Sequence, residues 1–276
     1  MSVPDVTLNN GVRMPQLGFG VFQVPPGEAE SAVRTALEAG YRSIDTAAIY
    51  GNEEEVGKAI RASGLPREEV FVTTKLWNSD QRYDAALAAF DRSMGRLGLD
   101  VLDLYLIHWP MPARDLYMDA WRALRRLYED GRVRAIGVSN FTVETLRRVI
   151  DESGIVPAVN QIELHPRLAQ AELRAFHAEH GIATESWGPL GQGKGLLEDP
   201  VLTRLADKHR RTPAQIVLRW HLQLGCIVIP KSVTPSRIAE NIDVFGFELD
   251  EEDMAEIATL DTGERLGFDP ETMNMA

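Results

Sequence analysis

The 276-residue chain has little of what disulfide-stabilised or membrane-spanning proteins need. It contains a single cysteine, Cys226, so no internal disulfide can form, which favours a reducing compartment. No apolar run approaches the roughly 18 residues of a membrane-spanning helix. The N-terminus has neither the basic segment nor the apolar core of a signal peptide. These absences predict a cytoplasmic protein that does not engage a membrane.

Positive charge is also scarce in this chain. Lys and Arg total 29 against 41 for Asp and Glu, which gives a formal net charge of −12. Such an acidic surface repels nucleic acid and anionic membranes, so neither is expected as a partner. Any phosphate that binds here must be held by a local cationic patch. Hydrophobic residues make up 44% of the chain, which is enough for a large core.

Short apolar runs alternate with longer amphipathic stretches along the whole chain. An Asn9-Asn10-Gly11 turn between residues 6–8 and 12–14 predicts a β-hairpin at the start. Strands that alternate with helices predict a parallel sheet with right-handed crossovers. The eight expected strands after the hairpin cover residues 17–19, 43–44, 71–74, 102–107, 133–138, 158–160, 182–186 and 227–229.

Helix-like stretches separate these strands, and their apolar residues recur at spacings of three or four. No linker or low-complexity stretch interrupts the pattern, so residues 1–276 are predicted to form a single domain. The expected fold is an α/β protein, a (β/α)8 TIM barrel with an N-terminal β-hairpin and extra helices. The expected helices cover 28–39, 53–62, 80–97, 115–128, 142–150, 169–179, 212–224 and 235–242, with an extra helix at 250–260.

A doubly wound sheet is the structural alternative, and it usually carries a glycine-rich turn after its first strand. The turn here has Gly18 and Gly20 at the spacing that begins GxGxxG, but Gln23 stands where the third glycine belongs. The dinucleotide fingerprint of that fold is therefore absent, and the barrel remains the preferred prediction.

Polar or aromatic side chains follow nearly every expected strand, and in a barrel the chemistry lies at these carboxyl ends. Asp45, Lys75 and His108 follow three consecutive strands, so they are expected to be neighbours. Any one of them could simply cap the next helix. A carboxylate, an ammonium and an imidazole gathered near the barrel axis are costly to bury and are more often functional. The other strand exits carry Ser139, Asn140, Gln161, Trp187 and Lys231.

Aromatic residues also gather on the loops that follow the strands. Tyr50 lies five residues past Asp45, in a loop that can fold over the mouth of the barrel, although taken alone it is more simply a half-buried loop residue. Phe22, Trp77 and Trp109 are expected to wall a substrate pocket, with packing between loops as the alternative. The tail at 261–276 has no Trp or Tyr, so an open mouth is expected.

At these residues the sequence resembles the aldo-keto reductase family over essentially its whole length. Within the family it is most similar to bacterial 2,5-diketo-D-gluconate reductases, which have Trp, as at Trp187, where many animal members have Tyr. No single segment carries the resemblance. The matching segments are GYRSIDTA at 40–47, YGNE at 50–53, LDVLDLYLIHWP at 99–110, IGVSNF at 136–141, NQIELHP at 160–166 and IPKS at 229–232.

The resemblance implies an NADP-dependent oxidoreductase that reduces aldehydes and ketones to alcohols by hydride transfer from C4 of the nicotinamide. It implies a catalytic tetrad of Asp45, Tyr50, Lys75 and His108. Tyr50 would be the general acid, and the neighbouring ammonium of Lys75 would lower its pKa from the free value of about 10. Asp45 would hold Lys75, and His108 would orient the carbonyl. The expected substrate-binding residues are Phe22, Tyr50, Trp77, His108 and Trp109.

The resemblance also implies that NADPH or NADP⁺ binds in an extended form across the mouth. Ser139, Asn140 and Gln161 would bond its carboxamide, and Trp187 would stack on the nicotinamide. Lys231, Ser232 and Arg237 match the positions that hold the adenosine 2′-phosphate, although an ordinary solvated face is the alternative. The expected cofactor residues are Gly20, Val21, Phe22, Asp45, Ser139, Asn140, Gln161, Trp187, Gly188, Leu190, Gly191, Gln192, Lys231, Ser232, Val233, Arg237 and Asn241.

Two further motifs resemble a nucleotide-hydrolysis site and a metal site, but neither pattern is complete. Residues 188–195 nearly match a P-loop, but Gly195 replaces the Ser or Thr that would bind Mg²⁺, so a strap over the cofactor pyrophosphate is expected instead of nucleotide hydrolysis. His177 and His180 lie three residues apart on a helix, where an exposed polar face is a better interpretation than a metal site. No metal is expected.

A protein of another class remains an alternative, because a fold does not fix a function. The same barrel could serve as a catalytically weak regulatory or structural protein that binds the cofactor. The intact tetrad favours the enzyme, with a small carbonyl compound as its substrate. No strong interface signal is present in the sequence, so a monomer is expected.

Overall fold

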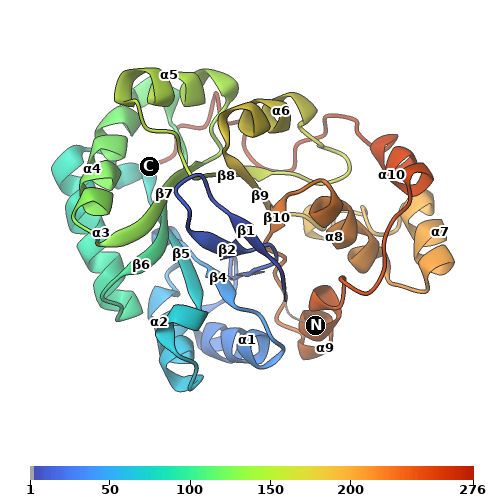
Figure 1. Ribbon diagram of the computed structural model, residues 1–276. Helices are drawn as coiled ribbons and strands as arrows, with labels where there is room; N and C mark the ends of the chain where they lie inside the picture. Colours follow the sequence, from blue (N-terminus) through green and yellow to red (C-terminus); the bar gives the residue numbers. More distant parts are fainter. Residues whose placement is uncertain (1–2) are drawn as a thin grey trace.

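In the computed structural model, which describes residues 3–276, eight parallel strands surround a common axis and helices enclose them (Figure 1). The strands are hydrogen-bonded in chain order, and a parallel bridge between Leu17 and Val228 joins the first to the last. This arrangement confirms the predicted (β/α)8 class. The strands are β3 (Phe19–Gly20), β4 (Ser43–Asp45), β5 (Phe71–Leu76), β6 (Leu102–Ile107), β7 (Val133–Ser139), β8 (Val159–Glu163), β9 (Ala183–Trp187) and β10 (Ile227–Val228).

A helix returns the chain after each strand, as parallel pairing requires. These helices are α1 (Pro26–Glu38), α2 (Glu53–Ala62), α3 (Tyr83–Leu97), α4 (Tyr117–Glu129), α5 (Val143–Ser153), α6 (Ala171–His180), α8 (Pro213–Gln223) and α9 (Pro235–Ile242). Single 3-10 turns occupy η1 (Ala48–Tyr50), η2 (Arg67–Glu69), η3 (Asn78–Asp80), η4 (Pro112–Arg114) and η5 (Gly191–Gly193). No helix within residues 3–276 is long and apolar enough to cross a bilayer.

Two extra helices, α7 (Pro200–His209) and α10 (Glu251–Ala258), pack against each other beside the barrel (Figure 1). The extra helix expected near the C-terminus corresponds to α10. The sequence analysis missed α7, although the side chain of Asp199 caps its N-terminus and Pro200 occupies its first position. An Asp followed by a Pro is a frequent start signal for a helix.

The predicted hairpin is confirmed as β1 (Asp5–Thr7) paired antiparallel with β2 (Arg13–Pro15). Leu8 and Met14 of this hairpin are buried in one cluster with Leu104 of β6, which lies inside the barrel. The hairpin therefore closes the amino-terminal end of the barrel, and the opposite end is the one available for a site.

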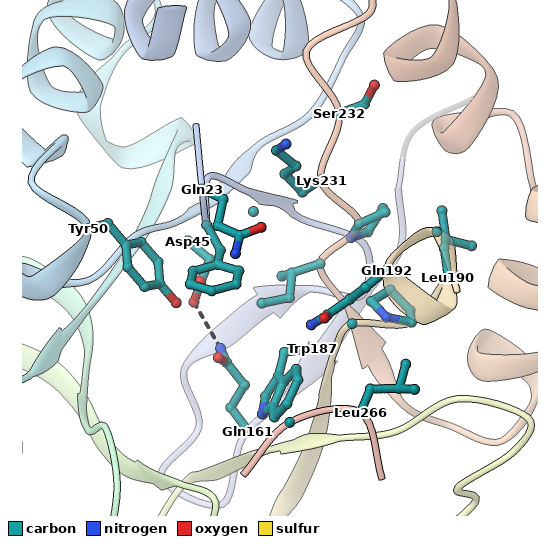
Figure 2. A pocket seen from close by; sticks show the side chains of 18 of the residues that line it. Gln23, Asp45, Tyr50, Gln161, Trp187, Leu190, Gln192, Lys231, Ser232 and Leu266 are labelled. Atoms are coloured by element: carbon teal, nitrogen blue, oxygen red, sulfur yellow. Dashed lines mark hydrogen bonds between the residues drawn. The ribbon is translucent and has the colours of Figure 1, made fainter. Parts of the chain in front are cut away.

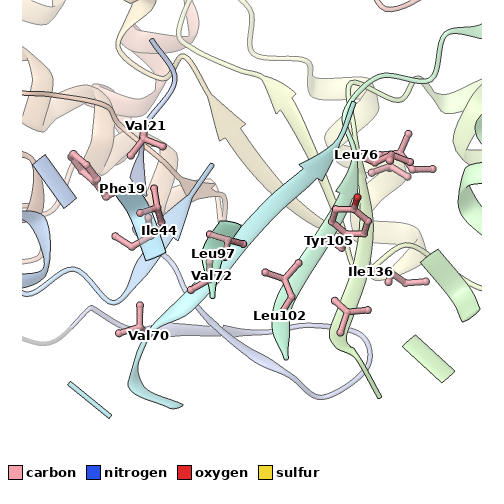
Figure 3. Close-up of a cluster of buried hydrophobic side chains, with 14 of the residues drawn as sticks. Phe19, Val21, Ile44, Val70, Val72, Leu76, Leu97, Leu102, Tyr105 and Ile136 are labelled. Atoms are coloured by element: carbon pink, nitrogen blue, oxygen red, sulfur yellow. The ribbon is translucent and has the colours of Figure 1, made fainter. Parts of the chain in front are cut away.

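Strand alternation decides which side chains reach the centre of the barrel, because successive residues point to opposite faces. Ile44 of β4 and Val72 of β5 belong to the large cluster between the sheet and the helices (Figure 3). Asp45, the residue after Ile44, and Lys75, three residues after Val72, point to the opposite face of the sheet, so they face inward and bond to each other. The apolar outer face anchors the strands, and the polar inner face carries the candidate chemistry.

Candidate active site

A cavity of about 960 Å³ opens at the carboxyl ends of the barrel strands (Figure 2). Its lining includes Tyr50, Trp77 and His108, together with Lys231 and Arg237 from the loop after β10 and the start of α9. The opening therefore gathers side chains that are far apart in sequence, as the barrel prediction required.

The four residues of the expected tetrad lie together. The ammonium of Lys75 donates hydrogen bonds to the Asp45 carboxylate at 2.6 Å and to the backbone oxygen of Thr46 at 2.9 Å. The Lys75 Nζ lies 5.2 Å from the centre of the Tyr50 ring, and that ring lies 5.8 Å from the His108 ring. Lys75 and Asp45 are almost fully buried, so their ion pair is shielded from solvent.

Burial and neighbouring charges set the protonation of this cluster. Burial alone would lower the pKa of Lys75, but the Asp45 carboxylate and Tyr50 outweigh it and raise that pKa. Lys75 lowers the pKa of Tyr50, as expected, but burial raises that pKa by more, so the net shift in the free protein is upward. Burial and the charge of Lys75 hold the pKa of His108 well below its usual range. His108 is therefore neutral at neutral pH.

The side chain of Asn140 links the carboxyl ends of β6, β7 and β9. Its amide nitrogen donates to the backbone oxygen of His108 at 3.0 Å, and its amide oxygen accepts a 2.8 Å hydrogen bond from the indole of Trp187. The Ser139 hydroxyl donates to the backbone oxygen of Gln161 at 2.9 Å. These contacts fix the orientation of polar groups at the cavity floor.

The Gln161 side chain connects the tetrad to a residue that the sequence analysis missed. Its amide nitrogen donates to Asp45 at 2.8 Å (Figure 2) and to the carboxyl of Glu185 at 2.8 Å. Glu185 lies in the middle of β9 and is fully buried. A charged residue within an otherwise uncharged strand could have indicated a functional position. The sequence alone does not show whether its side chain points into the barrel.

The cations near α9 differ from the buried lysine. Lys231 and Arg237 are exposed, line the cavity and form no ion pair with a carboxylate within residues 3–276, whereas Arg211 nearby pairs with Asp243 at 2.6 Å. Asn241 is buried at the cavity wall, and no other described side chain or backbone group bonds its amide. These groups are available to an anionic ligand.

Most of the expected cofactor residues line the cavity, and two do not. Val21 is fully buried in the core, with its backbone bonded to Asp45 and Asn52, and Gly191 is packed beneath Leu196. The expected substrate residues all line it. The cofactor residues that line it are Gly20, Phe22, Asp45, Ser139, Asn140, Gln161, Trp187, Gly188, Leu190, Gln192, Lys231, Ser232, Val233, Arg237 and Asn241.

The C-terminal tail also contributes to the cavity wall, which was expected to consist of Phe22, Trp77 and Trp109. Phe268 packs edge-on against Trp109 with ring centres 6.4 Å apart, and Met273 is buried against Trp109 and Met111. The tail lacks Trp and Tyr, but its Phe and Met residues give it an apolar face. That composition was the signal that the sequence analysis overlooked.

A buried carboxylate anchors this tail. Glu163, at the end of β8, accepts hydrogen bonds from the backbone N–H of Leu266 at 2.5 Å and of Gly267 at 3.0 Å, and it contacts the His165 ring at 3.1 Å. A Cβ at Gly267 would lie 2.5 Å from the Trp187 ring, so the tail approaches the indole more closely than a larger residue allows. The tail is thus fixed beside Trp187.

The expectation for His177 is also corrected. This histidine is fully buried, and its two ring nitrogens bond to Asn160 at 3.0 Å and Thr184 at 2.8 Å. Burial lowers its pKa to about 3, so it is neutral. It connects α6 to the strands, while His180 on the same helix is half-buried and stacks on Phe176.

The comparisons with known proteins agree with this geometry. Residues 16–262 match the model of the aldo/keto reductase family, and the chain belongs to that family. It is 61% identical over 271 residues to an aldo-keto reductase of Mycolicibacterium smegmatis, covering 98% of both chains. It is 56% identical to the methylglyoxal reductase DkgA of Yersinia pestis, covering 97% of this chain and 96% of that one.

A solved structure extends the likeness to the whole fold. A variant of Gox0644, crystallised in complex with NADPH, is 52% identical and superimposes with a TM-score of 0.95 over 99% of each chain. The barrel, the cavity at the strand ends and the family assignment together define an oxidoreductase.

Proposed function

We propose that this protein is an NADPH-dependent reductase of aldehydes and ketones in which Tyr50 donates the proton. The observation that carries the proposal is the gathering of Asp45, Lys75, Tyr50 and His108 around one cavity at the carboxyl ends of the strands. The relative named methylglyoxal reductase supports a small carbonyl compound as the substrate. Tyr50 lines the cavity and is half-buried, so a carbonyl oxygen can reach its hydroxyl.

The part of the cavity wall formed by the loop after β10 and the start of α9 has side chains suited to the phosphate of NADPH. Lys231 and Arg237 offer cations to the 2′-phosphate, and the Asn241 amide offers a buried hydrogen-bonding group. Arg can meet a phosphate with a bidentate pair of N–H groups, and Lys adds a point charge. Gly20 lets β3 lie close to the segment after β10 at this edge of the cavity, because a Cβ there would lie 2.9 Å from the backbone oxygen of Ile229. We infer that Ser139, Asn140, Gln161 and Trp187 hold the nicotinamide.

The residues of the tetrad have distinct parts in the proposed reduction. NADPH, when bound, supplies a hydride to the carbonyl carbon. Tyr50 keeps its proton in the free protein and donates it to the carbonyl oxygen as negative charge develops there. The ammonium of Lys75, held by Asp45, stabilises the phenolate that remains. His108 is neutral and can hydrogen-bond the carbonyl oxygen without competing as a proton source.

The substrate would lie against an apolar wall of Phe22, Trp77, Trp109 and the tail. This wall is made of aromatic rings and Met side chains, which adapt to different shapes. We propose that several unrelated aldehydes are reduced. We further propose that the enzyme is a monomer formed by one domain. We also propose that it is cytoplasmic, which is supported by its single, buried cysteine, Cys226.

The Tyr50→Phe variant tests the proton donor. It keeps the ring and removes the hydroxyl, so we expect turnover to fall by about 10²–10⁴-fold while NADPH still binds. NADPH oxidation with a reactive aldehyde, followed by nicotinamide absorbance, measures turnover, and quenching of protein fluorescence measures binding. Near-normal turnover in this variant would rule out the assigned role of Tyr50.

A further inference from the structure

Glu185 is a buried carboxyl that the proposed mechanism does not use. It lies in register with Gln161 on the neighbouring strand, and both side chains point into the barrel. One Glu185 oxygen accepts the hydrogen bond from Gln161, and the other is buried without a partner among the described residues. The Gln161 amide group is thus held between two carboxyls, those of Glu185 and Asp45.

The charges around Glu185 do not balance if it is ionised. The titratable groups that face it are Asp45 from β4, Lys75 from β5 and Tyr50 from the turn after β4. Its partner in β10 is Ile227, which carries no charge. A single ammonium therefore serves two buried carboxyls. A buried carboxylate without its own cation is costly, so Glu185 retains a proton at neutral pH. Burial, followed by the charge of Asp45, raises the pKa of Glu185 to about 8.

We propose that Glu185 is a positioning residue for the reduction, which holds Gln161 and Asp45 in place while it is neutral and weakens Tyr50 as an acid when it ionises. The proposal rests on the proposed function. Loss of the Glu185 proton adds a second negative charge near the Tyr50 hydroxyl. That charge binds the Tyr50 proton more tightly, so proton donation to the substrate becomes harder. The rate of reduction then falls on the alkaline side.

The Glu185→Gln variant keeps the shape of the neutral acid and cannot ionise. Single-turnover reduction is measured against pH, because product release can hide the chemical step in steady-state rates. We expect the variant to stay within about threefold of the wild-type rate near pH 6.5 and to move its alkaline limb up by about one pH unit or more. Glu179→Gln, the same change on the exposed face of α6, should leave the profile unchanged.

Infrared spectroscopy of the wild-type protein provides a readout that does not depend on activity. We expect the band of a protonated buried carboxyl, which disappears as the pH is raised through about 8 and is absent from Glu185→Gln. An unshifted alkaline limb with normal turnover in the variant, or no such band at pH 6, would overturn the proposal and leave the reductase function intact. Failure of the wild type to oxidise NADPH with any aldehyde would instead overturn the proposed function.

Discussion

The cavity holds its positive charges in two different ways. Lys75 is fully buried and shares a 2.6 Å ion pair with Asp45 beneath Tyr50. Lys231 and Arg237 are exposed and have no carboxylate partner in the described chain. The first cation is committed to the protein, and the other two are left for a ligand.

This difference follows from the cost of burying charge. An ammonium inside the barrel must be paired, and its field then acts on neighbouring groups through a medium of low polarity. An exposed cation is stabilised by water and keeps its hydrogen-bonding groups free, but salt screens its field. The buried cation is thus suited to adjusting the acidity of Tyr50, and the exposed pair is suited to recruiting a phosphate against the net charge of −12.

Removal of the buried cation should have the largest effect. In Lys75→Met the side chain keeps much of its length but loses its charge, so the Tyr50 phenolate is no longer stabilised. We expect turnover to drop by about 10²–10⁴-fold, with a changed pH–rate profile and retained NADPH binding. Lys58→Met on the surface of α2 is the control. A profile that keeps its height and shape would assign Lys75 a structural role.

Removal of an exposed cation should have a smaller and more selective effect. A charge-assisted hydrogen bond contributes about 1.5–3 kcal/mol, so Arg237→Ala should weaken NADPH binding by roughly 10–100-fold. NADH lacks the 2′-phosphate, so its dissociation constant should change little, and added salt should reduce the wild-type preference for NADPH. Arg122→Ala on α4 serves as the control. Equal weakening for both dinucleotides would show that Arg237 does not contact the phosphate.

A buried histidine, His177, can be compared with the buried cation Lys75, because His177 is buried without a charge. Because the pKa of His177 is about 3 in the folded protein, only the unfolded chain takes up a proton as the pH falls below about 6.5. Stability should therefore fall toward acid by about 1.4 kcal/mol per pH unit from this residue, until the pH approaches 3. Urea unfolding of His177→Asn should show a shallower pH dependence. The matched change at half-buried His180, on the same helix, is the control.

The fold was predictable because its signals are local and repeated. The hairpin turn at Asn10-Gly11 and the alternation of strands with helices were sufficient for the barrel class, and the rule that chemistry lies at the strand ends brought Asp45, Lys75 and His108 together. The helix α7 was not predicted, although Asp199 is a frequent type of helix start. Asp199 follows the glycine-rich residues 188–195, and this stretch was interpreted only as a loop that resembles a P-loop.

The missed features of the site depend on the path of the chain in three dimensions. Glu185 lies within a strand, and only the register with Gln161 shows that it reaches the barrel centre. The contact of Phe268 with Trp109 joins residues more than 150 positions apart, and no local pattern predicts it. The sign of the Tyr50 pKa shift required the degree of burial, which the sequence does not provide.

The anchor of the tail has a consequence for exchanging parts between enzymes. Glu163 contacts backbone N–H groups of the tail, and these are the same whatever side chains the tail carries. Gly267 is constrained, because a Cβ there would meet the Trp187 ring, and Arg265 adds an ion pair with Glu163 at 3.8 Å. A foreign segment grafted after Gly267 should therefore dock on the same barrel. It would bring its own side chains to the pocket wall, so the choice of substrate could be rebuilt while Asp45 and Lys75 stay as they are.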